Sequence, residues 1–261
     1  MDLGLAGRAC IVTGASRGIG AATAELLAAE GARVLLVARD EQRLSEVAAR
    51  CEGSATLSLD VTEPDAGDSA VAACRGRFGS VDVLVNNAGT SRFRPLEELT
   101  DQDYQEQWEL HVMASLRFMR AAVPVMWERS WGRIVNVCSS SGKRPSGSNV
   151  AYSVSKSAQL ALSRAYADAY AGRGVLVNAV APGPVESPLW TAPGGLADQS
   201  AERKGTDRER VLEEARAKIP LGRFGSEEEI AAVIAFLCSE RASDVAGAAW
   251  SVDGGSVPSI V

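Results

Sequence analysis

Short apolar runs alternate with longer stretches of helical spacing along almost the whole chain, a pattern typical of α/β proteins. Because the apolar runs are continuous and do not alternate with polar residues, they predict strands buried on both faces of a parallel sheet. They cover residues 9–13, 33–38, 56–61, 81–86, 133–138, 175–181 and 248–253. The stretches between them predict helices over 18–30, 42–50, 65–78, 103–128, 151–172 and 226–239. We therefore expect a doubly wound α/β fold with about seven parallel strands and helices on both faces.

Length and composition indicate one globular domain over residues 1–261. The 261 residues exceed the ~150 of an average domain, but a single α/β unit often reaches ~250. Hydrophobic residues make up 46% and charged residues 23%, which excludes an intrinsically disordered chain. The net charge of −6, with no long basic run, argues against a nucleic-acid-binding protein.

Other features of the sequence argue against a membrane protein and against a metalloprotein. The start of the chain lacks a signal peptide, and no run approaches the ~18 apolar residues of a membrane span, so we expect a soluble cytoplasmic protein without membrane contact. The five cysteines are scattered without metal-binding spacing, which predicts reduced thiols. The single histidine excludes a histidine-rich site, so we expect no bound metal.

The alternation breaks once, between residues 186 and 218, where prolines and glycines interrupt a largely polar segment. Such a long insertion is either a functional lid or a disordered excursion. Because this one follows the end of a strand, where ligands bind in folds of this kind, we expect a lid over the substrate.

A glycine-rich turn at residues 13–20, with the sequence TGASRGIG, joins the first expected strand to the first expected helix. Glycines permit a tight turn and let backbone N–H groups approach a pyrophosphate, while the helix N-terminus favours negative charge. The alternative is a simple strand-to-helix connection. The strand before it and the helix after it favour a dinucleotide site, with these candidate contacts: Gly14, Ser16, Arg17, Gly18, Ile19 and Gly20.

The T-G-x-x-x-G-x-G spacing resembles the short-chain dehydrogenase/reductase family, and further motifs continue the resemblance along nearly the whole chain. In order, they are Asp60-Val61, N-N-A-G at 86–89, Ser139, Y-x-x-x-K at 152–156, Pro182-Gly183 and D-G-G at 253–255. The resemblance implies a Rossmann-type single domain that binds a nicotinamide dinucleotide. It also implies further cofactor contacts at Asp60, Val61, Asn87, Ala88, Gly89, Tyr152, Lys156, Pro182, Gly183, Val185 and Ser187.

The end of the second strand predicts which dinucleotide is bound. A carboxylate there would bind the ribose 2′-OH of NAD and repel a 2′-phosphate, but Ala38 stands at that place and Arg39 follows. With Arg17, this gives two guanidinium groups that suit a phosphate. The alternative is that Arg39 is a solvated surface charge. We expect NADP(H), with NAD(H) as the second choice.

Tyr152 and Lys156 are four residues apart, so they share one face of a helix. A nearby ammonium and an oxidised nicotinamide would lower the pKa of the phenol, so that Tyr152 could exchange a proton with an alcohol or a ketone. By resemblance, Lys156 also holds the nicotinamide ribose. Ser139 is the candidate that binds the substrate oxygen. Ser140 and Ser141 are its rivals, but the family's S-x-x-G spacing ending at Gly142 favours Ser139.

One departure from the family pattern is His111, which stands where many members carry an asparagine that holds a water in a proton relay. Helical spacing places His111 on the inward face of its helix. An imidazole could bridge the same water, which makes His111 a fourth candidate catalytic residue. Alternatively, it is a neutral core histidine bonded to a backbone carbonyl.

Together these features predict an NADP(H)-dependent oxidoreductase that interconverts a ketone and a secondary alcohol by hydride transfer. The alternatives are the narrower role of a 3-oxoacyl-carrier-protein reductase, whose family members this chain resembles, and a non-catalytic protein that senses the cofactor. Small and apolar residues on several faces of 151–170, together with the resemblance, predict a homodimer or homotetramer.

Overall fold

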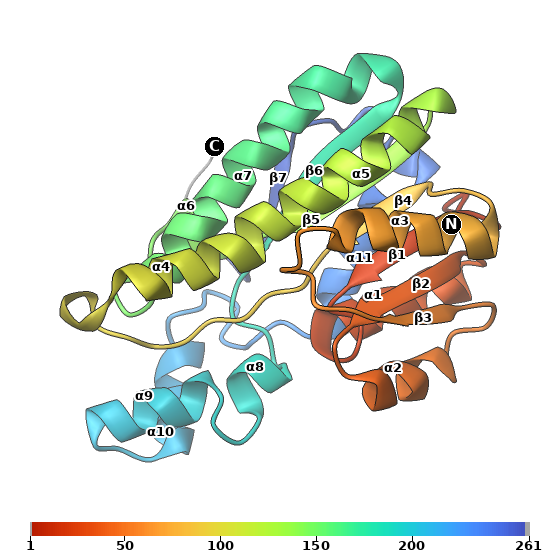
Figure 1. Ribbon diagram of the computed structural model, residues 1–261. Coiled ribbons are helices and arrows are strands. Elements are labelled where there is room, and N and C mark those ends of the chain that lie inside the picture. The colour runs from red at the N-terminus through yellow and green to blue at the C-terminus, as the bar shows by residue number, and fades with distance from the viewer. Residues whose placement is uncertain (1, 259–261) are drawn as a thin grey trace.

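The computed structural model describes residues 2–258, and Figure 1 shows how their elements are arranged. One parallel sheet has the strand order β3-β2-β1-β4-β5-β6-β7. Its strands are β1 (Ala9–Thr13), β2 (Arg33–Ala38), β3 (Ala55–Ser58), β4 (Val83–Asn86), β5 (Gly132–Val137), β6 (Val175–Pro182) and β7 (Ala249–Val252). The strand order reverses between β1 and β4, which is the switch point where doubly wound sheets bind ligands. The predicted fold class is confirmed.

Helices cover both faces of the sheet, as Figure 1 shows. One face carries α1 (Gly18–Ala29), α2 (Glu41–Ala48) and α11 (Glu227–Leu237). The other carries α3 (Ala66–Phe78), α5 (Ala114–Glu128) and α7 (Val150–Tyr170). The remaining helical segments are α4 (Asp101–Trp108), the π-helical turn η2 (Glu109–Met113), α6 (Ser140–Lys143), α8 (Pro188–Thr191), α9 (Leu196–Lys204), α10 (Arg208–Arg216) and the short 3-10 turns η1 (Leu96–Glu98), η3 (Ala171–Arg173) and η4 (Glu240–Ala242).

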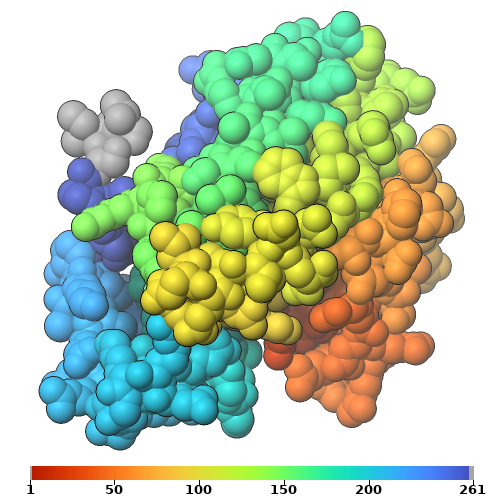
Figure 2. Space-filling model, turned by 60° about the vertical axis from the view of Figure 1, so that its left-hand side comes forward, coloured from red at the N-terminus to blue at the C-terminus, as the bar shows by residue number. Residues whose placement is uncertain are grey.

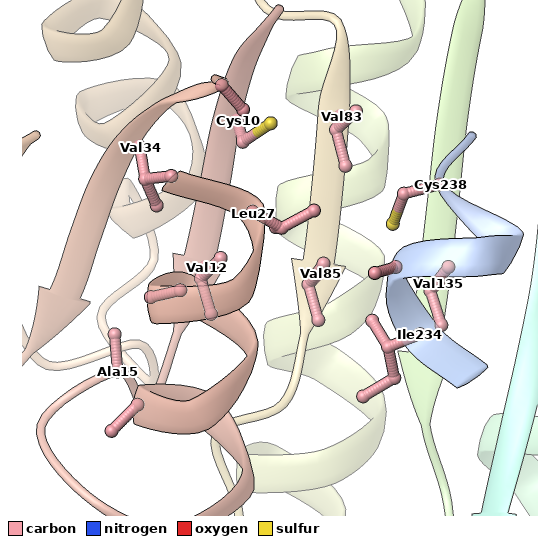
Figure 3. Packing of buried hydrophobic residues seen from close by; sticks show 14 of the residues in the cluster. Cys10, Val12, Ala15, Leu27, Val34, Val83, Val85, Val135, Ile234 and Cys238 are labelled. Atoms are coloured by element: carbon pink, nitrogen blue, oxygen red, sulfur yellow. The ribbon is translucent and has the colours of Figure 1, made fainter. Parts of the chain in front are cut away.

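Two apolar clusters hold these layers together, one on each face of the sheet. Figure 3 shows the first, in which Leu27 of α1 and Ile234 of α11 pack onto valines of the central strands. The second joins α3, α5 and α7 to the opposite face. All five cysteines are buried and unpaired, and Cys10 and Cys238 belong to the first cluster. Between residues 2 and 258, no helix combines the length and the apolar character needed to cross a bilayer.

The prediction that every strand is buried on both faces is wrong at the two edges of the sheet. The interior strands are buried almost throughout, whereas β3 alternates between half-buried and exposed residues and most of β7 is exposed. The helices cover the centre of the sheet more completely than its edges. Periodicity cannot reveal this difference, because it depends on where neighbouring elements end.

The helix predicted over 103–128 is also wrong as one continuous element. It begins at Asp101, because Thr100 and Asp103 form a capping box, with the Asp103 amide donating to Thr100 Oγ1 and the Thr100 amide donating to the Asp103 carboxylate. It is then interrupted by η2, an insertion of a kind often found at functional sites. The polar segment expected as a lid at 186–218 forms α8, α9 and α10, which lie together at one end of the molecule in Figure 1.

Candidate active site

A cleft of about 1840 Å³ opens beyond the carboxyl ends of β1, β4, β5 and β6. Its walls come from the glycine-rich turn, the segments after these strands, and α8–α10. Figure 2 shows the hollow between the cyan segment of α8–α10 and the red and orange N-terminal part, below the yellow region around α4. Because ordinary ligand pockets measure ~300–1,000 Å³, this cleft has room for a dinucleotide together with a substrate.

The glycine-rich turn forms a cradle at the floor of the cleft. Gly14 and Gly18 have φ angles of 66° and 65°, which favour glycine. A Cβ on Gly14 would lie 2.9 Å from the Cα of Ala88, so the turn can approach the segment after β4 this closely only with glycine at position 14. Arg17 does not cap α1 with its side chain, and the first N–H groups of this 12-residue helix remain available for an anion. The cradle therefore fits a pyrophosphate.

Thr13 ties the cradle to the segment that follows β4. Its Oγ1 accepts hydrogen bonds from the amides of Asn87 (2.9 Å) and Ala88 (3.1 Å), and the Asn87 side chain donates to the Thr13 carbonyl (2.9 Å). The predicted contacts Ser16, Arg17, Ile19 and Gly89 line the cleft. Gly20 lies outside the lining and instead packs against Gly14 and the Asn87 side chain, where a Cβ would not fit.

The end of the cleft beside β2 carries the residues expected to select the dinucleotide. Ala38, Arg39, Asp60 and Val61 all line it. The Arg39 side chain is 81% exposed and lies 3.7 Å from the Asp60 carboxylate. Burial alone would raise the pKa of Asp60, but hydrogen bonds from Thr62 and the Arg39 charge outweigh it and lower that pKa below its usual value. The arrangement leaves the Arg39 guanidinium in solvent at the mouth of the cleft.

Ser139, Tyr152 and Lys156 meet on the wall formed by β5 and α7. Ser139 follows β5 and accepts from the Ser141 amide (3.1 Å), while Tyr152 and Lys156 lie on successive turns of α7. Lys156 Nζ is 5.7 Å from the centre of the Tyr152 ring. Ser140 and Ser141 also line the cleft. Of the three serines, Ser139 is the one whose side chain interacts with the Tyr152 phenol and lowers its pKa.

Gly142 explains the spacing between the serine and the tyrosine. A Cβ at this position would lie 2.9 Å from the backbone carbonyl of Lys156. The turn α6 can therefore pack onto α7 only with glycine there. This close approach places Ser139 beside Tyr152.

The predicted direction of the Tyr152 shift is wrong for the protein by itself. Burial raises the pKa of Tyr152 to about 12, and the Ser139 hydroxyl opposes this only in part. Burial also lowers the pKa of Lys156 to about 8. The prediction relied on the lysine charge and on an oxidised nicotinamide, whereas desolvation dominates in the protein alone.

His111 is fully buried on η2, outside the lining of the cleft. Its Nε2 accepts from the Thr90 amide (3.4 Å), so Nδ1 carries the proton and donates to Ser155 Oγ (2.9 Å). Its ring meets that of Tyr152 edge to face at 5.2 Å. Burial, and then the Lys156 charge, lower the pKa of His111 well below its usual value. A neutral core histidine fits these contacts, although its partners are an amide and a hydroxyl in place of the expected backbone carbonyl.

The end of β6 and the segment after it carry the last group of expected contacts. Pro182, Gly183, Val185 and Ser187 line the cleft, and Ser187 directly precedes α8. Trp190 follows on α8, and its ring lies 5.1 Å from that of Phe224 and 6.2 Å from that of Phe93. Trp190 therefore both lines the cleft and packs α8 against other segments.

Phe93 and Gln199 were missed by sequence reasoning. The Phe93 amide donates to Gln199 Oε1 on α9 (3.0 Å), which joins the segment after β4 to α8–α10. The signal available in the sequence was an aromatic residue four positions after the end of the N-N-A-G motif, but its partner lies more than a hundred residues away.

Comparisons with known proteins agree with this geometry. The family model described as Enoyl-(Acyl carrier protein) reductase matches residues 14–256. The 3-oxoacyl-[acyl-carrier-protein] reductase FabG of Escherichia coli (strain K12) is 36% identical over 253 residues, covering 95% of this chain and 97% of that protein. The short-chain reductase protein NovJ of Streptomyces niveus is 39% identical over 249 residues, covering 94% and 92%. The crystal structure of L-sorbose reductase from Gluconobacter frateurii, complexed with NADPH and L-sorbose, superimposes with a TM-score of 0.93 at 36% identity, covering 100% of both chains.

Proposed function

The chain belongs to the short-chain dehydrogenase/reductase family, and from this membership we propose that it interconverts a ketone and a secondary alcohol with NADP(H). The observation that carries the proposal is the meeting of Ser139, Tyr152 and Lys156 on one wall of a cleft whose floor is a glycine cradle. We take residues 1–261 as one catalytic domain, with a substrate lid at about 186–218. The unpaired cysteines support a reducing, cytoplasmic location.

The residues around the cleft fit a nicotinamide dinucleotide. The cradle and the free N–H groups of α1 would hold the pyrophosphate, Asp60 and Val61 the adenine, and Lys156 the nicotinamide ribose. When bound, the reduced nicotinamide supplies the hydride. Ala38 leaves no carboxylate to repel a 2′-phosphate, and the exposed Arg39 is available to bind one, which supports NADP(H). The solved L-sorbose reductase complex contains NADPH.

Proton transfer falls to Tyr152. With a pKa raised to about 12, its phenol is protonated at neutral pH and can donate to a ketone oxygen as negative charge develops there. Ser139 donates a second hydrogen bond to the same oxygen, and Lys156 places its ammonium close to the phenol. Oxidation of an alcohol would use the same groups in reverse, and it requires the phenol to lose its proton first.

A second candidate function is reduction of a 3-oxoacyl group on a carrier protein, which the relative in Escherichia coli supports at 36% identity. Cationic side chains at the cleft provide a further reason. Arg92, Arg144, Arg203 and Lys218 line it and could attract an anionic carrier arm. The L-sorbose reductase, which matches over its full length, instead supports a polyhydroxylated ketone.

An assembly of two or four copies is the form that we propose for the enzyme. Trp108 of α4 is 43% exposed and Val154 of α7 is 47% exposed, and both line a groove of about 320 Å³ between these helices. A second copy of this face would cover the groove. Apolar patches of this kind are ordinary contacts between subunits.

The test measures oxidation of reduced cofactor with a panel of ketones that includes a 3-oxoacyl thioester and L-sorbose, using NADPH and NADH in parallel. We expect turnover with a higher kcat/KM for NADPH. Tyr152→Phe removes the transferable proton, so its kcat should fall by about 10²–10⁴-fold. Its Kd for NADPH should stay close to that of the wild type.

Substantial turnover by Tyr152→Phe would contradict the proposed role of the phenol. Tight NADPH binding by a wild type that reduces no ketone in the panel would instead favour a cofactor sensor. A preference for NADH would overturn the assignment of the cofactor.

A further inference from the structure

The wall that carries Ser139, Tyr152 and Lys156 is called the catalytic wall below. On its protein side, a series of hydrogen-bonded, buried polar groups begins at Lys156. Its Nζ donates to Gln159 Oε1 (2.9 Å) and to the Val137 carbonyl (2.9 Å). Gln159 Nε2 donates to Ser115 Oγ on α5 (2.7 Å), and that hydroxyl donates to the His111 carbonyl on η2 (2.8 Å). Gln159 is 1% exposed and Ser115 is 4% exposed. An amide buried this deeply is tolerated because every polar atom at this junction has a partner.

The direction of this chain is fixed by the chemistry of its members. An ammonium has only donors, so the amide must turn its oxygen towards Lys156 and its nitrogen towards Ser115. The Ser115 hydroxyl has one proton, which it gives to the His111 carbonyl, so its oxygen is free to accept from Gln159. A flipped amide would set two donors against each other at Lys156. The network therefore holds Gln159 in one orientation.

Lys156 lines the cleft, whereas Gln159 and Ser115 lie outside its lining. Of the three N–H donors of the ammonium, two are bound on the protein side by Gln159 and Val137. The third has no acceptor within residues 2–258, which leaves it for a ligand in the cleft. The position of the ammonium is therefore fixed by its two acceptors on the side away from the cleft.

We propose that Gln159, anchored by Ser115, is a positioning residue that holds the Lys156 ammonium at the catalytic wall and keeps it charged there. The proposal rests on the function proposed above, in which Lys156 assists Tyr152. It assigns Gln159 an indirect role, since this side chain does not line the cleft.

The groups around Lys156 explain why the Gln159 amide affects the charge of the lysine. The titratable groups facing Lys156 are Tyr152 on the same helix, Cys138 after β5 and His111 on η2. Within residues 2–258, Lys156 makes no ion pair, so neutral carbonyl oxygens are its only hydrogen-bond partners. Burial lowers the pKa of Lys156 to about 8, close to working pH, where the loss of one such partner changes the charged fraction.

The test uses two variants that keep the size of the side chain and change its charge or polarity. Gln159→Met removes the accepting oxygen, so the ammonium loses a stabilising partner and the pKa of Lys156 should fall. Gln159→Glu puts a carboxylate in the same place, and the pKa should rise. A shift of one unit in either direction changes the ratio of charged to neutral amine about tenfold.

Nuclear magnetic resonance of the protein labelled with ¹³C at lysine Cε gives a readout that is independent of activity. The sequence has only four lysines, Lys143, Lys156, Lys204 and Lys218. Lys156→Arg identifies the signal of interest, and the other three lysines serve as internal controls. We expect opposite shifts in the Lys156 titration for the two variants, and a smaller downward shift for Ser115→Ala.

Kinetics provide the second readout, in which kcat/KM for ketone reduction is measured against pH. Activity should fall as pH rises through the pKa of Lys156, at a lower pH in Gln159→Met and at a higher pH in Gln159→Glu. Lys156 titrations that coincide with wild type in both variants would overturn the positioning role. If the titrations shift but Lys156→Ala keeps wild-type turnover, the proposed function of Lys156 fails and the positioning role remains.

Discussion

His111 shows how one buried side chain couples stability to pH. Both of its ring nitrogens are bonded inside the protein, and burial lowers its pKa well below the usual 6.5. The neutral form is therefore the folded form at physiological pH. Because this is the only histidine in the chain, its contribution can be measured separately from that of any other imidazole.

We predict that His111 makes the fold acid-sensitive between pH 6.5 and its lower native pKa. The unfolded chain binds a proton near pH 6.5 and the folded chain does not, so the free energy of unfolding falls as pH falls, by up to about 1.4 kcal/mol per pH unit. Above pH 6.5 the effect disappears. Urea titrations from pH 5 to pH 8 should give a steeper loss for wild type than for His111→Asn, and equal slopes would show that the imidazole does not resist protonation.

That the three candidate catalytic residues lie together could be predicted from the sequence, but their electrostatics could not. Ser139, Tyr152 and Lys156 stand at fixed spacings beside expected strand ends, and the structure brings them together. The Tyr152 pKa shift depends on burial, which spacing does not report. Gln159 is on the same helix as Lys156, yet a polar helical residue is usually exposed. Only the position of α5 shows that it is buried.

Helix α3 packs against α5 through a glycine, and this contact gives a prediction at the scale of elements. A Cβ on Gly67 would lie 2.6 Å from the Arg117 carbonyl, which is part of the backbone of α5. Gly76 lies on the same helix with no atom within 4 Å of the corresponding position. The two glycines are matched in helix and chemistry and differ in their surroundings.

Gly67→Ala should therefore destabilise the protein by about 1–3 kcal/mol, because the helices must move apart. Gly76→Ala should be neutral or stabilising by up to about 1 kcal/mol, since alanine favours the helix and meets nothing. Urea unfolding monitored by circular dichroism measures both. If the two variants have the same stability, α3 and α5 do not approach each other as closely as the surroundings of Gly67 indicate.

The sequence predicted which main helices and strands exist more accurately than it predicted where they end or are interrupted. The runs predicted at 9–13 and 33–38 coincide with β1 and β2, because an uninterrupted apolar run between turn residues has few alternatives. The π turn η2 carries no comparable signal, since it is stabilised by contacts with α4, α5 and α7. The helices at 188–216 were hidden because short polar helices lack a long apolar stripe.

For the whole molecule, the exposed groove between α4 and α7 predicts association. Val154→Arg would place a charge in the groove that we propose a second copy covers, and burying that charge is costly. We expect light scattering coupled to size-exclusion chromatography to show a lower mass for this variant. Ala72→Arg, at an exposed position of α3 outside the groove, is the control and should keep the wild-type mass. A single-subunit mass for the wild type would remove the basis for the assembly.

The two sides of the cleft differ in how they are attached to the rest of the protein. The floor is fastened by the bonds of Thr13 to Asn87 and Ala88. The chain enters and leaves α8–α10 through two adjacent segments paired at Val185 and Gly225, with the Glu186 amide donating to the Gly225 carbonyl and the Gly225 amide donating to the Pro184 carbonyl. Across the cleft, the Phe93 amide adds one bond to Gln199 of α9. Because the two ends of this segment lie side by side, a segment of another length or sequence could replace it without changing the path of the chain elsewhere. Substitutions within this segment would therefore alter one wall of the cleft and leave the hydrogen bonds of the glycine cradle in place.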